Sequence, residues 1–329
     1  MTYLYDATAF QGEHPVQGDQ KGRDAAGSET RSMVWLRGQP HLEDYLSFYR
    51  KKVIGGDKID PRTLTARWRE ANDLYYALEQ EEGGIADTIA CKPLDKRLAG
   101  LAARLEANDW FRTSFDNLPY SIELVELDKL VVSQIQVENG FSHTIAARLG
   151  PKPTPAQLFR FCLPVERDLA PVKIQRLSAN RYQFSSPSSD FRAHDTILLR
   201  NPDLADVKLP GPAAALLGIS VGFGSNFLSA VRSGSRVVLQ NGYHRAYALR
   251  SVGITHAWCV VEHVTRKDEL RLSATEDVLG DPAFYLLAKR PPILRDFFDP
   301  RIAEQVLTKP TDCLVEIEIK VRSTTITSV

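Results

Sequence analysis

Apolar residues recur at helical spacing in three segments of the first third of the chain. They are Leu42, Tyr45, Leu46, Tyr49 and Val53; then Leu64, Trp68, Ala71, Tyr75 and Leu78; then Leu94, Leu98, Leu101 and Leu105. Spacings of three and four residues place such side chains on one face of a helix. The pattern predicts mainly helical structure between residues 41 and 106, as a small bundle or cap. The side chains expected to be largely buried there are Leu64, Trp68, Leu98 and Leu101.

The pattern changes near Pro119, where β-branched and apolar residues dominate short segments. Residues 120–137 and 194–200 are typical of strands, and residues 171–186 of a hairpin that turns at Ser178–Asn180. Residues 313–322 alternate apolar and charged positions, as a strand with one covered face does. Residues 209–230 are apolar and glycine-rich. Their glycines, Gly218, Gly222 and Gly224, match no phosphate-loop spacing and favour a flexible turn before a helix at 226–231.

A strand–helix–strand unit is predicted over residues 237–261. The apolar run Val237–Leu239 meets Asn241 and Gly242, residue types that cap a helix and permit a sharp bend. Residues 243–251 read as a helix that Gly253 ends, and an apolar strand follows. We expect the helix to begin within two residues of Gly242 and both strands to lie in one sheet.

Composition excludes several classes of protein. The 41 basic and 41 acidic residues balance, which argues against a protein that coats nucleic acid by bulk charge. Binding through a local basic cleft remains an alternative. No apolar run is long enough for a membrane span, and the N-terminus lacks the pattern of a secretory signal. The four cysteines are widely separated, so neither a zinc site nor a redox dithiol is indicated. We expect a cytoplasmic protein with no membrane contact.

His244 and Arg245 stand in the first turn of the predicted 243–251 helix, where the helix dipole repels cations. The pair is favourable there if an anion binds, because phosphate accepts backbone N–H bonds, a bidentate arginine contact and a histidine contact together. The pattern therefore indicates half of an anion site. The alternatives are that Arg245 pairs with a carboxylate and that His244 is a buried histidine bonded to a backbone carbonyl.

The sequence around this turn resembles the ParB/sulfiredoxin-like superfamily, whose members carry a Gly-x-His-Arg or Gly-x-Arg-Arg turn followed by a helix and an apolar strand. The matching residues are Gly242, His244, Arg245, Ala248 and Gly253. Residues 121–134 resemble the opening strand and loop of the same domain. The resemblance covers the two ends of residues 117–265; about half of that segment, including the 171–185 hairpin, is unmatched.

The resemblance implies that Asn241, Gly242, Tyr243, His244 and Arg245 bind nucleotide phosphates, as ATP or CTP with Mg²⁺. Sulfiredoxins have a catalytic cysteine where this chain has Tyr243, which excludes their chemistry. Related serine kinases have an aspartate where this chain has Asn241, which cannot act as a base. An acidic residue of this region serves as base in those kinases, and Glu126 is the candidate here; the alternative is that Glu126 is an ordinary surface carboxylate on a half-exposed strand. The helix-turn-helix of the chromosome-partitioning members has no evident counterpart.

The sequence thus predicts an α+β protein with a ParB/sulfiredoxin-like mixed sheet. We divide it into a loosely ordered arm (1–33), a helical region (34–116), the ParB/sulfiredoxin-like domain (117–265) and a C-terminal extension with a final strand (266–329). The expected function is nucleotide or phosphate binding, with NTPase or small-molecule phosphotransferase activity as one form. The alternative is a non-catalytic regulatory module that binds DNA or a protein partner.

Overall fold

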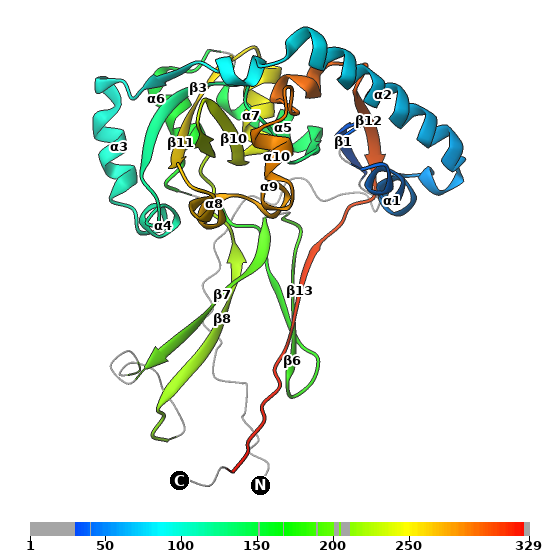
Figure 1. Ribbon diagram of the computed structural model, residues 1–329. Helices are drawn as coiled ribbons and strands as arrows, with labels where there is room; N and C mark the ends of the chain where they lie inside the picture. Colours follow the sequence, from blue (N-terminus) through cyan, green and yellow to red (C-terminus); the bar gives the residue numbers. More distant parts are fainter. Residues whose placement is uncertain are drawn as a thin grey trace.

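The computed structural model describes residues 30–325 except 40, 151, 167, 189, 201–203 and 205–210. The protein is an α+β protein with a body of helices and sheets, from which two groups of strands project (Figure 1). The main helices are α1 (Leu42–Lys52), α2 (Pro61–Glu82), α3 (Ala99–Glu106), α4 (Asp109–Ser114), α5 (Asn139–Leu149), α6 (Pro155–Cys162), α7 (Tyr243–Ser251), α8 (Lys267–Ser273), α9 (Glu276–Gly280) and α10 (Pro282–Leu286). None of the described helices is both long and apolar enough to cross a bilayer.

A five-stranded mixed sheet forms the centre of the body, in the order β10-β9-β11-β3-β2. Its strands are β10 (Arg236–Asn241), β9 (Ser229–Ser233), β11 (His256–Val264), β3 (Tyr120–Glu126) and β2 (Cys91–Pro93). Val237, Val238, Leu239, Val260 and Val261 are fully buried, so the predicted apolar runs are its core. The prediction for residues 237–261 is confirmed: α7 follows β10 directly, and β10 and β11 share this sheet.

The predicted helix at 226–231 is wrong, because Ser229–Ser233 form β9. This strand lies between β10, to which it is antiparallel, and β11, to which it is parallel. Ala230 and Val231 are fully buried. Backbone hydrogen bonds to a partner strand on each edge stabilise this segment as a strand. The periodicity of a short apolar segment does not reveal such partners.

A second, three-stranded sheet has the order β12-β1-β4 and joins distant parts of the chain. Its strands are β12 (Ala303–Thr308), β1 (Arg31–Leu36) and β4 (Gln136–Glu138). Residues 31–36 are thus a strand, where we predicted the end of a loose arm and the start of a helical region; the rest of that arm, 1–29, lies outside the described residues. The sheet exists because β1 finds partners more than a hundred residues away.

The N-terminal helices do not form one bundle. Residues 41–106 are mainly helical, as predicted, and Leu64 and Leu98 are buried, whereas Trp68 and Leu101 are partly exposed. However, α1 packs with the start of α2 around Trp35, while α3 and α4 belong to the main core with Phe111. Figure 1 accordingly places α1 and α3 at opposite sides of the body. Each helix therefore covers a different part of the sheets.

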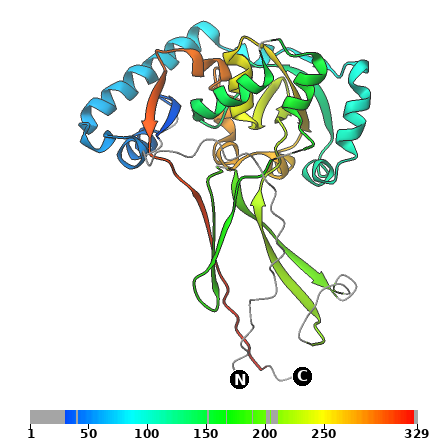
Figure 2. The same cartoon turned by 180° about the vertical axis from the view of Figure 1, so that it is seen from behind.

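Two strand groups project from one side of the body (Figures 1 and 2). One is a sheet of β5 (Lys173–Arg176), β6 (Arg181–Ser186) and β13 (Cys313–Glu318) in the order β13-β6-β5. The other is a two-stranded ribbon of β7 (Phe191–Arg200) and β8 (Ala215–Phe223). The strands predicted at 171–186 and 194–200 are confirmed, and the first hairpin turns between Leu177 and Arg181, around the predicted position. The strand predicted at 313–322 is confirmed for Cys313–Glu318 only, since residues 319–322 lie outside any strand.

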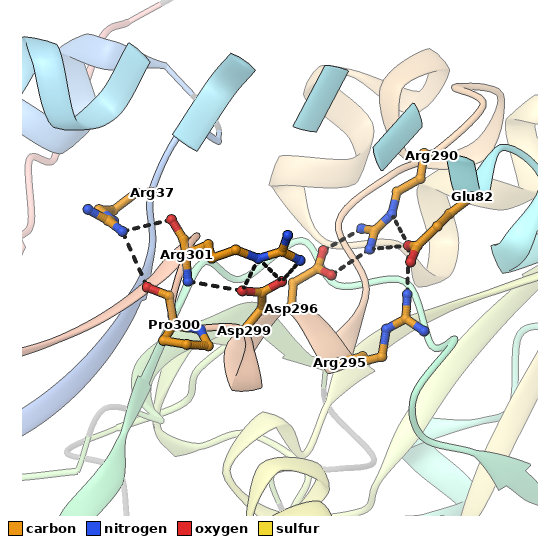
Figure 3. A network of polar contacts seen from close by, with 8 residues as sticks. All are labelled: Arg37, Glu82, Arg290, Arg295, Asp296, Asp299, Pro300 and Arg301. Carbon is orange, nitrogen blue, oxygen red and sulfur yellow. Dashed lines mark hydrogen bonds and ion pairs between the residues drawn. The ribbon is translucent and has the colours of Figure 1, made fainter. Parts of the chain in front are cut away.

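A buried ion-pair network fastens the segment that follows α10 to the end of α2 (Figure 3). The side chain of Arg290 is 1% exposed; its Nη2 lies 2.7 Å from Asp296 Oδ1 and 3.1 Å from Glu82 Oε2. Asp296, 2% exposed, also accepts the N–H of Ile293 at 3.0 Å. Arg295 donates to the same oxygen of Glu82 at 2.6 Å. Two carboxylates thus pair with the guanidinium of Arg290, whose charge would destabilise the fold if it were buried without partners.

We expect Asp296→Asn to lower the free energy of unfolding by about 3–5 kcal/mol, because it leaves the buried Arg290 charge without its closest partner. The double variant Arg290→Met with Asp296→Leu should recover much of that loss, since no unpaired charge stays buried. Chemical denaturation measures both. Arg301→Ala, which breaks an exposed pair with Asp299, is the control and should change stability by less than about 1 kcal/mol. Equal losses in Asp296→Asn and Arg301→Ala would contradict the role of the buried network.

Candidate functional site

The turn between β10 and α7 is built around Gly242. Its φ is +91°, in the left-handed region that side chains disfavour. A Cβ at this position would lie 3.0 Å from Leu228 Cα, so the backbone of the preceding loop packs directly on the glycine. Gly242 is therefore required both by its dihedral angle and by the space available.

Asn241 does not cap the helix in the way that the sequence predicted. Its Oδ1 accepts the N–H of Gly242 at 2.9 Å, and its Nδ2 donates to the carbonyl of Ser225. In the described part of the chain, no side chain caps α7, whose N-cap residue is Gly242 itself. The short loop after β8 thus lies against the turn, held there by Asn241.

Tyr243 is a structural residue of the core, in contrast to the predicted role in phosphate binding. It is 5% exposed, and its hydroxyl donates to the carbonyl of Leu239 at 2.7 Å. The same oxygen lies 3.1 Å from the N–H of Ser133 and 3.3 Å from that of Gln134. The phenol therefore ties α7 to β10 and to the segment that precedes β4. Burial raises its pKa, so it stays protonated.

His244 is a neutral hydrogen-bond acceptor. Its Nε2 accepts the N–H of Glu138 at 3.2 Å, which requires an unprotonated nitrogen, and its ring meets that of Phe141 edge-on at 5.4 Å. Burial, followed by the positive charge of Arg245, lowers its pKa to about 4. The idea of two cations at the helix start is thus wrong for His244. Its ring bonds to the backbone, as the alternative had it, but it accepts the N–H of Glu138 and does not donate to a carbonyl in this bond.

Arg245 points to the loop that carries Asn226. Its Nη1 donates to the Asn226 carbonyl, and its Nη2 lies 2.5 Å from Asn226 Oδ1. Both of these bonds go to Asn226, one to its backbone and one to its side-chain amide. Asn226 therefore orients the guanidinium of Arg245 at the first turn of α7.

Glu126, the predicted base, is engaged elsewhere. Its Oε2 accepts the N–H of Ala90 at 2.9 Å and lies 3.3 Å from Lys129 Nζ. Two residues further on, Asp128 pairs with Arg250 in the last turn of α7. The end of β3 therefore meets the C-terminal end of the helix, about 9 Å along its axis from His244 at 1.5 Å per residue.

A second polar cluster, which we did not predict as a unit, lies on one face of the central sheet. Ser121 Oγ donates to Glu123 Oε1 at 2.6 Å and lies 2.8 Å from His263 Nε2, while Arg232 forms two bonds to Glu123 at 2.6 and 2.8 Å. The cluster borders an open groove of about 780 Å³ that Cys91 also lines. The alternation of Ser121 and Glu123 along β3 was the available signal.

The donor directions of this cluster do not activate Ser121. Its proton goes to Glu123, so His263 donates to the serine oxygen and does not act as a base toward it. Burial raises the pKa of Glu123, but Arg232 and Ser121 lower it further, and the net shift is downward. The carboxylate is thus a weak base, and the cluster is a paired network on a sheet.

We expect Tyr243→Phe to lower the free energy of unfolding by about 1–3 kcal/mol, because the Ser133 N–H and the Leu239 carbonyl lose a partner inside the core. Tyr76→Phe is the control, since Tyr76 lies 63% exposed on α2. Denaturant titration measures both. If the two variants were equally stable, the hydroxyl of Tyr243 would not organise the turn.

His244 should make stability depend on pH in a defined window. Its pKa is about 4 in the folded protein and about 6.5 in the unfolded chain, so between these values the unfolded state binds more protons. This contribution is complete above pH 6.5 and is lost as pH falls toward 4. His244→Gln, which keeps an acceptor for Glu138, should flatten the stability profile between pH 4 and 6.5. His143→Gln, at an exposed position of α5, should leave the profile as in the native protein; identical profiles for the native chain and His244→Gln would refute the assignment.

Comparison of the chain with protein-family models, with curated proteins and with solved structures finds no match in any of the three. The α+β class follows from the elements and sheets described above. The assignment to a superfamily accordingly stays a prediction that depends on the residues of the β10–α7 turn.

Proposed function

We propose that the protein binds a phosphate-bearing ligand, a nucleotide such as ATP or CTP, at the first turn of α7, in the manner of the ParB/sulfiredoxin-like superfamily. The observation that carries the proposal is the start of α7 at a positive-φ glycine without a side-chain cap. The first N–H groups of a helix have no acceptor within the helix, and they carry its partial positive charge. A helix start of this kind favours the binding of an anion.

Arg245 and His244 support this proposal in different ways. Arg245 supplies positive charge at the turn and is oriented by Asn226, so its position needs little reorganisation when a phosphate binds. His244 stays neutral above pH 4 and holds the backbone of Glu138 beside the turn. In this proposal the predicted phosphate contacts of His244 and Tyr243 are replaced by backbone N–H groups of the first turn.

Phe141 favours a nucleotide over free phosphate. It is 50% exposed on α5, and its ring lies 5.4 Å from that of His244. An exposed aromatic ring next to a phosphate site offers a base a surface for stacking, an interaction worth about 1–3 kcal/mol per base. In this proposal the Phe141 ring contacts the base of the nucleotide, and the start of α7 contacts its phosphates.

The proposed role is binding without turnover. Asn241 is not a base, and Glu126 is held by Ala90 and Lys129 toward the other end of α7. Residues 241–245 contain no carboxylate to hold Mg²⁺, so they suit the anion and not the metal. A magnesium ion would arrive with the nucleotide, bound through its phosphates. These features favour the regulatory form of the predicted function over a phosphotransferase.

We expect ATP or CTP to bind the native chain and Arg245→Ala to weaken that binding about ten- to a hundredfold, since a hydrogen bond to a charged group contributes about 1.5–3 kcal/mol. Arg245→Lys should be almost as weak, because lysine lacks the planar fork. Gly242→Ala should abolish binding through strain against Leu228. Isothermal titration with ATP, CTP and inorganic phosphate measures these affinities.

Two controls separate binding from stability. Asn226→Ala removes the side-chain hydrogen bond between Asn226 and Arg245 but keeps the charge of Arg245, so it should weaken binding less than Arg245→Ala while lowering the melting temperature similarly. Arg148→Ala, at an exposed position of α5, should change neither quantity. A native chain that binds none of the three ligands, or a folded Arg245→Ala variant with unchanged affinity, would overturn the proposal.

A further inference from the structure

The β7–β8 ribbon has an apolar face that the body covers only at its root. Alternate positions of β8, from Ala215 through Leu217, Ile219 and Val221 to Phe223, are all apolar and point to the same side. At the root, Phe191 is 4% exposed, and its ring lies 5.4 Å from that of Phe223. Further out, the same face is bare.

The bare part of this face consists of a cross-strand group of aliphatic residues. Leu198 pairs with Leu217, and Thr196 pairs with Ile219. Leu198 is 53% exposed, Leu217 is 68% exposed and Ile219 is 41% exposed. An isolated two-stranded ribbon is at best marginally stable in water, and three or more strands with a hydrophobic face, or packing against a helix, are needed for independent stability. Beyond its root, the ribbon therefore needs further strands, which the described elements do not supply.

The outer edge of β8 lacks the devices that protect sheet edges. The nine-residue strand ALLGISVGF contains no charged residue and no proline. Its Gly218 and Gly222 permit another backbone to approach closely. In the described part of the chain β8 pairs only with β7, and β13 lies beside β7, which leaves the β8 edge as the open one.

Charge favours a second copy of this chain as the partner. An antiparallel pair of β8 strands places no like charges opposite each other, because β8 carries no charged residue. The whole chain has a formal net charge of zero, so two copies do not repel each other. A two-fold axis near Ile219 would place Leu217 of each copy near Val221 of the other, on one apolar face.

We propose that two copies of the chain pair through the edges of their β8 strands and form a four-stranded antiparallel sheet of β7, β8 and their symmetry mates. Such an isologous contact closes on itself, so it produces a dimer and not a fibre. The pairing satisfies the unpaired backbone groups of β8 and joins the bare aliphatic faces of the two ribbons.

Sedimentation equilibrium of the full chain tests the proposal. The native protein should approach twice its chain mass of 36.8 kDa as concentration rises. Ile219→Lys brings two ammonium groups together at the axis and should weaken dimerisation about tenfold or more. Ile197→Lys is the matched control, because Ile197 is 50% exposed on β7 and faces the opposite side, opposite Gly218; it should dimerise like the native chain.

Hydrogen exchange provides a second measurement. The amides of residues 215–223 should gain protection as the native chain dimerises, and Ile219→Lys should lose that gain while its melting temperature stays near the native value. A native chain that is monomeric at its highest soluble concentration, or a dimer that Ile219→Lys leaves unchanged, would overturn the proposal. So would a monomer that sediments with phosphatidylcholine vesicles, because a lipid surface would then be what covers the ribbon.

Discussion

The buried charge of Arg290 is the constraint on which the position of the candidate site depends. Asp296 and Glu82 neutralise it, and in doing so they hold the segment after α10 against the body. Ile293 in that segment bridges to Val131, and Val131 bonds on its other side to β10 through Val237 and Leu239. The strand that leads into the α7 turn is therefore positioned by an ion pair far from it along the chain.

Local signals explain what the sequence predicted well. The β10–α7–β11 unit was found because Gly242 and Gly253 mark the two ends of its helix and both have positive φ. The 171–186 hairpin was found because its turn and its partner strand are adjacent in the chain. In both cases the residues that decide the structure lie within a few positions of each other, where periodicity and cap residues report them directly.

Non-local partners explain what the sequence could not predict. His244 accepts a hydrogen bond from the N–H of Glu138, which lies 106 residues earlier, and its charge state depends on burial in the folded protein. The role of Arg245 depends on Asn226, in a loop whose position is set by β9 between its two neighbours. A Gly-x-His-Arg motif therefore located the turn, but the motif does not reveal which of its polar groups point inward. The contact of Glu126 with the N–H of Ala90 is likewise non-local, since Ala90 lies 36 residues earlier and reaches Glu126 only in the folded sheet.

The ribbon and the α7 turn are connected by very few residues. β8 ends at Phe223, and Ser225 and Asn226 immediately afterwards bond to Asn241 and Arg245. A change in the register or tilt of β8 is thus transmitted to Arg245 through a short linker that is hydrogen-bonded at both ends. This linker consequently couples the proposed pairing surface to the proposed ligand site. Such coupling is what the regulatory interpretation requires.

The β1–β12 pair has a consequence for biosynthesis. Arg31 faces Thr308 across this pair, and the two residues are 277 positions apart. Until the ribosome has released β12, β1 has only β4 beside it, and the apolar side chains of Val34, Trp35 and Leu36 lack part of their final cover. Non-local strand pairing closes slowly and leaves apolar surface exposed meanwhile. The nascent chain therefore completes this sheet only after residues 303–308 have been translated, and a truncation before residue 303 removes a strand from the sheet that holds the first described segment.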